Sequence, residues 1–113
     1  MRESDEAYGK ALEIEPKNTY VLNNYSYYLS LRNDSLNKAE QMSLLSNQLD
    51  PGNSSFQDTY AWVLYKLGRY AEARVWMEKA MESGGRNSAV ILEHYGDILY
   101  RLGQQDKAFE YWD

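Results

Sequence analysis

Apolar residues recur along the chain at helical spacing, in seven stretches separated by turn-forming residues. Pro16 marks one break, the run Asp50-Pro51-Gly52-Asn53 a second, and the pair Gly84-Gly85 a third. A helix tends to end before a proline, because the preceding residue is pushed away from helical backbone angles. The pattern therefore predicts an all-α chain, with helices at 3–15, from Asn18 or Thr19 to about 32, and at 36–49, 54–67, 70–82, 88–102 and 105–113.

The same residue types return about every 35 residues. Three such sets are Tyr25, Ser26 and Leu29; Tyr60, Ala61 and Leu64; and Tyr95, Gly96 and Leu99. Asn33, Gly68 and Gly103 share another repeated position, and asparagine and glycine both tolerate the left-handed backbone that ends a helix. This period is typical of stacked helix-turn-helix units, none of which buries its apolar face alone. We predict one solenoid domain of about three repeats, divided into residues 1–18, 19–53, 54–88 and 89–113.

Small residues recur in both helices of each predicted repeat. Helices that pack about 8–10 Å apart need small side chains where they cross. The small residues of the first helices are Ser26, Ala61 and Gly96, and we expect them to face Ala39, Ala73 and Ala108 of the second helices. We expect a third set in the second helices to face the following repeat; its members are Ala11, Ser46 and Ala80.

These positions resemble the tetratricopeptide repeat over nearly the whole chain. The matching residues are Tyr60-Ala61, Leu64, Gly68, Tyr70, Ala73, Met77 and Ala80, then Tyr95-Gly96, Leu99, Gly103, Ala108 and Trp112. Residues 58–65 and 91–100 look like segments of bacterial members. The resemblance implies an α-α superhelix whose concave side, lined by the first helix of each repeat, holds a peptide or protein segment. Ser43, Ser46 and Gly85 depart from the pattern, and the two serines lead us to expect looser packing of the helix at 36–49.

Carrying the family's lining positions onto this chain identifies the candidate binding residues. They are Tyr20, Asn23, Asn24, Tyr27 and Ser30; Ser55, Asp58, Thr59, Trp62, Tyr65 and Lys66; and Val90, Glu93, His94, Asp97, Tyr100 and Arg101. We expect most of them to lie free of the core, with Trp62 and Tyr27 as the main aromatic anchors and Asn23 and Asn24 bonding a ligand backbone. The alternative is that the aromatic candidates pack between repeats, and we expect about half of them to do so.

Composition narrows the range of partners. Hydrophobic residues make up 43% of the chain and charged residues 26%, which favours a folded domain, and no apolar run reaches the ~20 residues that a membrane span needs. The net charge of −5 opposes nucleic-acid binding, which relies on clustered lysine and arginine. With no cysteine the chain forms no disulfide, and its compartment stays open between the cytoplasm and the bacterial cell envelope.

His94 is the only histidine, and Glu93 and Asp97 share its predicted helix. A carboxylate beside a histidine can orient it for proton transfer or metal binding, but such trios are also common on solvated helix faces. We therefore predict no catalytic residue, no metal and no cofactor, and interpret the chain as non-enzymatic.

The leading functional hypothesis is a protein-interaction scaffold that holds a partner segment against the first helices. Both ends of the chain interrupt a repeat, so we expect a piece of a longer protein. The alternative is a spacer or self-assembly module, in which apolar Phe109, Tyr111 and Trp112 on the last helix promote association.

Overall fold

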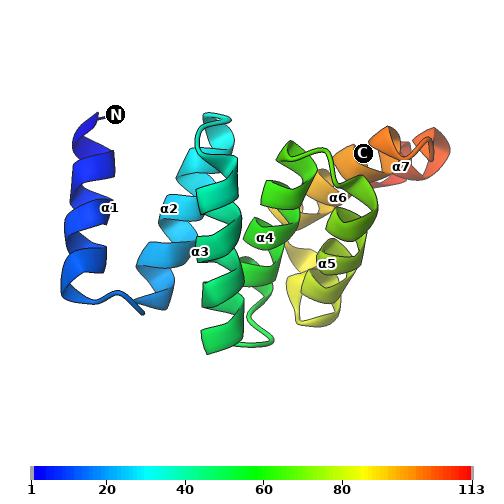
Figure 1. The fold of residues 1–113 in the computed structure, drawn as a ribbon. Coiled ribbons are helices and arrows are strands. Elements are labelled where there is room, and N and C mark those ends of the chain that lie inside the picture. The colour runs from blue at the N-terminus through cyan, green and yellow to red at the C-terminus, as the bar shows by residue number, and fades with distance from the viewer. Residues whose placement is uncertain (1, 113) are drawn as a thin grey trace.

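The computed structural model describes residues 2–112, with side chains described for 6–104, 106–108, 110 and 111. This part of the chain is helical throughout and contains no strand, which confirms the predicted all-α class (Figure 1). The elements are α1 (Arg2–Ile14), α2 (Thr19–Leu31), α3 (Leu36–Leu49), α4 (Ser54–Lys66), α5 (Tyr70–Glu82), the 3-10 helix η1 (Gly85–Asn87), α6 (Ala89–Arg101) and α7 (Gln105–Trp112).

The first helix of each repeat begins at a side-chain cap. The Asn18, Asn53 and Ser88 side chains accept hydrogen bonds from the backbone N–H groups three residues on, at 3.2–3.3 Å. The sequence predicted that these helices start at Asn18 or Thr19, at residue 54 and at residue 88. The observed caps coincide with the first and third of these starts, and Asn53 precedes the second by one residue.

The same helices end in one repeated motif. Asn33, Gly68 and Gly103 all adopt the expected left-handed backbone, with φ of 53°, 82° and 83°. The N–H of the next residue then donates to the carbonyl five residues back, as in Gln104 to Leu99 at 2.9 Å. Equivalent positions therefore end their helices alike, although asparagine replaces glycine in the first repeat.

Two irregularities between helices have local causes. The loop between α2 and α3 holds one extra residue, Ser35, which also takes a left-handed backbone (φ 50°) immediately before α3. In the connection between α5 and α6, Gly85 stands where the other repeat boundaries have proline, and its backbone lies against the end of α5. A Cβ there would lie only 2.7 Å from the Ala80 carbonyl oxygen, so a side chain is excluded and the chain turns through η1 instead.

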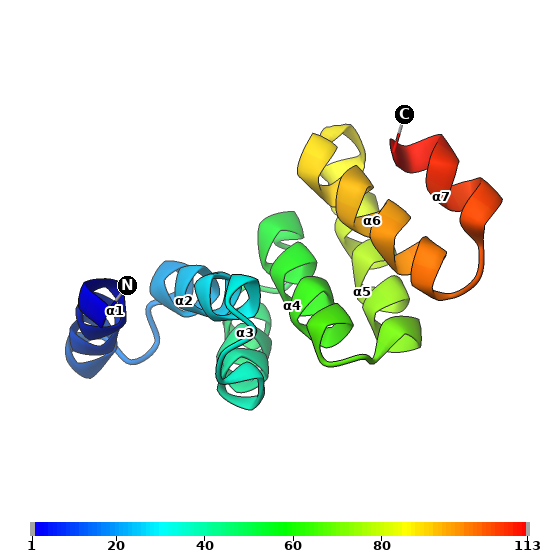
Figure 2. The ribbon, with the colours of Figure 1, turned by 90° about the horizontal axis from the view of Figure 1, so that it is seen from above.

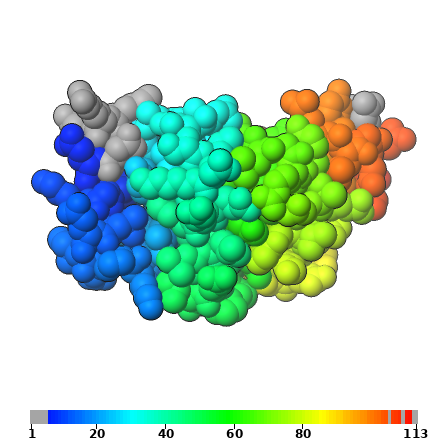
Figure 3. Space-filling view, in the orientation of Figure 1, coloured from blue at the N-terminus to red at the C-terminus, as the bar shows by residue number. Residues whose placement is uncertain are grey.

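The helices form two rows of different curvature. Seen from above, α2, α4 and α6 make the inner row, while α1, α3, α5 and α7 make the outer row (Figure 2). The array is elongated, with extents of 46 × 25 × 21 Å. On the face in Figure 3 the side chains of neighbouring repeats touch along the array, as expected for a solenoid.

The core follows the predicted small residues. Ala39, Ala61, Ala73, Ala80 and Ala108 are fully shielded from solvent, each beside larger apolar residues from the neighbouring helix. Close approach at these points lets tyrosine and leucine side chains fill the space on either side.

The serines of α3 are fully buried, and the looser packing expected of this helix stays a prediction. Ser43 and Ser46 have no exposed surface, and the Ser46 hydroxyl donates to the Ser43 carbonyl at 2.8 Å. Asn47 also joins α3 to α4, because its Nδ2 donates to the Phe56 carbonyl at 3.0 Å.

The residues proposed for self-assembly lie mostly outside the description. The side chains of Phe109 and Trp112 are not among the described residues. Tyr111 is half-buried and packs edge-on against Tyr95, with ring centroids 4.9 Å apart.

Two alanines on α5 test the close-approach account. Ala73→Leu forces extra volume into a filled helix crossing and should lower the free energy of unfolding by about 1–3 kcal/mol. Ala71→Leu places the same side chain on an exposed position of the same helix, and it should change the free energy of unfolding by less than about 0.5 kcal/mol. Urea denaturation measures both; equal effects would contradict the assignment of Ala73 to a crossing.

Candidate functional site

The inner row carries a hollow on its concave side. Its volume is about 270 Å³, and three consecutive first helices supply its walls. The lining residues are Asn23, Asn24 and Tyr27 from α2; Ser55, Asp58 and Thr59 from α4; and Val90 from α6. All seven belong to the candidate set from the sequence, so the repeat spacing brought these candidates from three helices together.

A buried polar pair joins α4 to α6 beside this hollow. His94 Nδ1 lies 2.9 Å from Asp58 Oδ1, and both side chains are buried. The sequence had associated His94 with Glu93 and Asp97 on a solvated face, and that interpretation was wrong. Asp58, on the preceding first helix, is the partner, because the stacking of repeats places α6 directly beside α4.

Four rings cross the concave face next to this pair, and we call them the aromatic strip: Tyr27, His94, Trp62 and Tyr65. Trp62 lies at the centre, stacked on His94 with centroids 3.9 Å apart and on Tyr65 with centroids 4.6 Å apart. The ring of Tyr27, on α2, lies beside that of His94, with ring centroids 6.3 Å apart. The strip thereby links all three helices of the inner row.

Trp62 is less accessible than the sequence suggested. It was expected to be a leading exposed anchor, but it is only 8% exposed, because His94 and Tyr65 cover both of its faces. Asp58, Thr59, His94 and Ser30 are buried as well.

The other candidates remain accessible to different degrees. Tyr27 is half-buried, as are Asn23, Tyr65, Lys66 and Asp97. The exposed candidates are Tyr20, Asn24, Ser55, Val90, Glu93, Tyr100 and Arg101. Of the five aromatic candidates only Trp62 is buried, fewer than the half expected, because Tyr20 and Tyr100 project from the helix ends.

Charge is unevenly distributed over this face. Burial raises the pKa of the Tyr27 hydroxyl, and the negative charges of Asp58 and Glu93 raise it further. The two cations lie toward the other end of the helices: Lys66 Nζ is 5.4 Å from the Trp62 ring centroid, and Arg101 Nε donates to the Tyr65 hydroxyl at 3.4 Å. The hollow is therefore the acidic half of the concave face.

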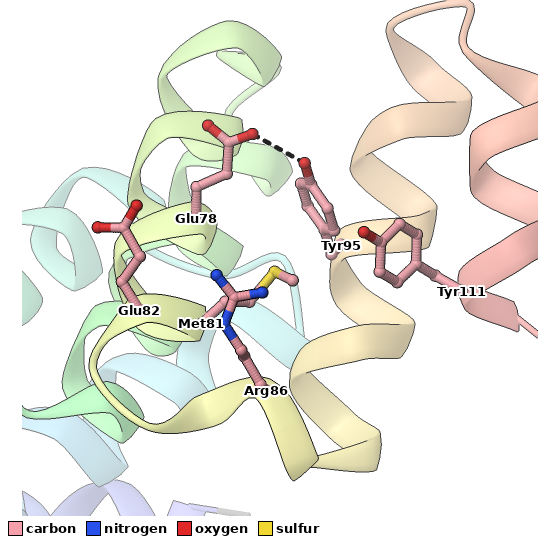
Figure 4. A pocket seen from close by; sticks show the side chains of 6 residues that line it. All are labelled: Glu78, Met81, Glu82, Arg86, Tyr95 and Tyr111. Atoms are coloured by element: carbon pink, nitrogen blue, oxygen red, sulfur yellow. Dashed lines mark hydrogen bonds between the residues drawn. The ribbon is translucent and has the colours of Figure 1, made fainter.

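A second cavity, of about 320 Å³, lies among α5, η1, α6 and α7 (Figure 4). It is lined by Glu78, Met81, Glu82, Arg86, Tyr95 and Tyr111, none of which was a candidate. The Tyr95 hydroxyl donates to Glu78 at 2.8 Å, and Tyr60 similarly donates to Glu40 at 3.3 Å. In both repeats the recurring tyrosine is therefore bound by a glutamate of the preceding second helix, a pairing that the tyrosine period alone does not reveal.

The described residues form neither a metal-binding cluster nor a membrane-spanning helix. Nowhere among them do three or more histidine, cysteine, aspartate or glutamate side chains gather as a metal-binding group. None of the described helices has the length and apolar character needed to cross a bilayer.

Antiparallel helix pairs stacked into a curved array define this molecule as an α-α solenoid. The family model for the tetratricopeptide repeat matches residues 1–112, and the chain belongs to this family. Proteins of this family generally serve as non-enzymatic scaffolds for protein–protein interaction.

Several relatives are bacterial. The chain is 30% identical over 112 residues to the type IV pilus assembly protein PilF of Pseudomonas aeruginosa, covering 97% of this chain and 44% of PilF. A solved structure from the functional characterization of PilF has a TM-score of 0.78 at 30% identity, covering 96% of this chain and 49% of that one. The chain thus spans less than half the length of PilF.

Two other likenesses are more distant. The repeat-containing protein PA4667 of the same organism is 28% identical over 68 residues, which are 60% of this chain and 12% of PA4667. The crystal structure of YrrB, described as a tetratricopeptide repeat protein with an unusual peptide-binding site, has a TM-score of 0.75 at 25% identity, covering 93% of this chain and 53% of YrrB.

The Tyr95 hydroxyl should make stability depend on pH in the alkaline range. Burial, followed by the hydrogen bond to Glu78, raises its pKa from 10.0 to about 12. The folded state holds this proton more tightly than the unfolded state, so the contribution is complete below pH 10 and is lost as the pH rises to about 12. Urea denaturation between those values should show a steeper loss of stability for the wild type than for Tyr95→Phe. The exposed control Tyr20→Phe should follow the wild type; a Tyr95→Phe curve parallel to the wild type would contradict this account.

Proposed function

We propose that the concave face of α2, α4 and α6 binds an extended or helical segment of another protein. The observation that carries this proposal is the hollow, because its walls come only from first-helix positions and from three consecutive repeats. A ligand seated there contacts the inner row without displacing any residue of the core between the rows.

The chemistry of the hollow suits a polypeptide. Asn23 and Asn24 offer amide groups, and the Asn23 Oδ1 atom is shielded from solvent yet has no hydrogen-bond partner among the described residues. A buried acceptor without a partner is costly, and a rotation of the Asn23 side chain that brings this oxygen to a ligand donor relieves that cost. Val90 and the ring of Tyr27 add apolar contact at the same place.

The wall behind the hollow is well suited to a preorganised site. The bond between Asp58 and His94 and the stacking of Trp62 on His94 restrict side-chain motion where a ligand would rest. Groups that are already ordered lose little further entropy on binding. In this role Trp62 supports the binding surface from behind, and the accessible contact is made by Tyr27, Asn24 and their neighbours.

A single substitution can fill the hollow without touching the core. Ser55 lines the hollow and is exposed, so Ser55→Trp should fold normally while occupying the space that a ligand needs. Peptides selected from a random display library against the wild-type domain should bind Ser55→Trp about tenfold more weakly or worse, as measured by fluorescence anisotropy. The control Ala71→Trp places the same ring on an exposed position of α5 and should leave the affinity unchanged.

Two outcomes would overturn the proposal. One is undiminished peptide affinity for Ser55→Trp when circular dichroism shows an intact fold. The other is a selection whose peptides are blocked by Ala71→Trp instead, which would place binding on the outer row.

A further inference from the structure

Two residues that line the hollow carry an acceptor oxygen with no donor among the described residues. Asn23 Oδ1 is the first. Asp58 supplies the second, because its Oδ1 is bonded to His94 while its other carboxylate oxygen receives no hydrogen bond from any described residue. Tyr27 lines the same space. Asn23 and Tyr27 come from α2 and Asp58 comes from the neighbouring α4, so the hollow brings these polar residues together from two helices.

The carboxylates of Asp58 and Glu93 make this region negative, and the imidazole of His94 is the base that contacts Asp58. No lysine or arginine lines the hollow. The raised pKa of Tyr27 reports the same field, since Asp58 and Glu93 both contribute to it after burial. His94 bonds to one oxygen of Asp58 only, and Lys66 and Arg101 are engaged with Trp62 and Tyr65 at the other end of the face. A cation entering the hollow therefore gains attraction in a partly desolvated site.

We propose that this hollow receives the ammonium group of a lysine side chain from the bound segment. This inference rests on the proposed function, and it specifies which side chain of the partner enters. Lysine fits better than arginine because an ammonium directs three donors to separate acceptors, whereas a guanidinium binds best to both oxygens of one carboxylate. One oxygen of Asp58 is already committed to His94, so that two-oxygen contact is not offered.

The position of the hollow favours a side chain over a chain terminus. The walls of the hollow come from α2, α4 and α6, and Tyr27 belongs both to its lining and to the aromatic strip. A segment crossing three helices continues past the hollow in both directions, so a lysine within the segment reaches it and a terminal amine is not required.

The test uses the peptides selected from the random display library, resynthesised with acetylated N-termini. Each lysine is replaced in turn by norleucine, which keeps the apolar stem and removes the ammonium, and separately by arginine. One lysine should be essential: its replacement by norleucine should weaken binding by roughly ten- to a hundredfold, the range expected for hydrogen bonds to a charged group. Arginine at that position should restore only part of the affinity.

A domain variant locates the lysine. Asn23→Leu removes the unpartnered oxygen with little change in side-chain size, so the lysine and norleucine peptides should differ much less in affinity for this variant. Asn37→Leu makes the same change on an exposed position of α3 and should preserve the wild-type difference. Because the peptide is changed as well as the protein, the comparison does not depend on the folding of any one variant.

The outcomes separate this inference from the proposed function. The lysine assignment would be overturned, and concave binding left intact, by one result: Ser55→Trp blocks the peptides, yet they contain no lysine or bind equally well with norleucine at every lysine position. A lysine effect of equal size in Asn23→Leu and the wild type would place the ammonium elsewhere and also overturn it. Failure of an acetylated peptide whose unblocked form binds would assign the hollow to a terminal amine instead. Binding that Ser55→Trp does not weaken would overturn the proposed function itself.

Discussion

Close approach of helix backbones at a few alanines is the constraint on which this structure depends. Ala39, Ala61, Ala73 and Ala108 leave no room for water or larger side chains at the crossings within repeats. Once those contacts are made, tyrosine and leucine side chains must fill the space beside them, and the inner and outer rows acquire their different curvature. The concave face is a consequence of that packing. Those of its residues that stay exposed, such as Asn24, Ser55 and Val90, are available for recognition.

The inner row is not simply a set of exposed helix faces. Asp58 and His94 form a buried hydrogen bond between α4 and α6, and the Trp62 ring stacks on His94. Burial of such a polar pair has a desolvation cost that its own hydrogen bond only partly offsets, so its contribution is better understood as orientation than as stability. It holds one carboxylate oxygen of Asp58 and leaves the other without a donor among the described residues. The same bond that ties two repeats together thus also shapes the acidic half of the concave face.

The sequence predicted the helices and their ends well because those depend on local chemistry. Helical spacing and turn residues located α3 and α5 to the residue, and the shared position of Asn33 with two glycines correctly indicated a left-handed end. Side-chain partners between helices were harder to predict. The period aligns equivalent residues but does not state the offset between neighbouring helices, so Asp58 was not recognised as the partner of His94, and Trp62 was expected to be exposed. The second cavity escaped notice for the same reason, since its residues come from three helices and from the turn at η1.

The most direct test of the account is a map of ligand contact on the folded domain. Amide and side-chain NMR signals would be followed while a library-selected peptide is added to the labelled wild-type protein. We expect the largest chemical-shift changes on all three helices of the inner row, around Asn23, Asn24, Tyr27, Ser55, Thr59 and Val90. Shifts concentrated on α3 and α5, with the inner row unchanged, would contradict it.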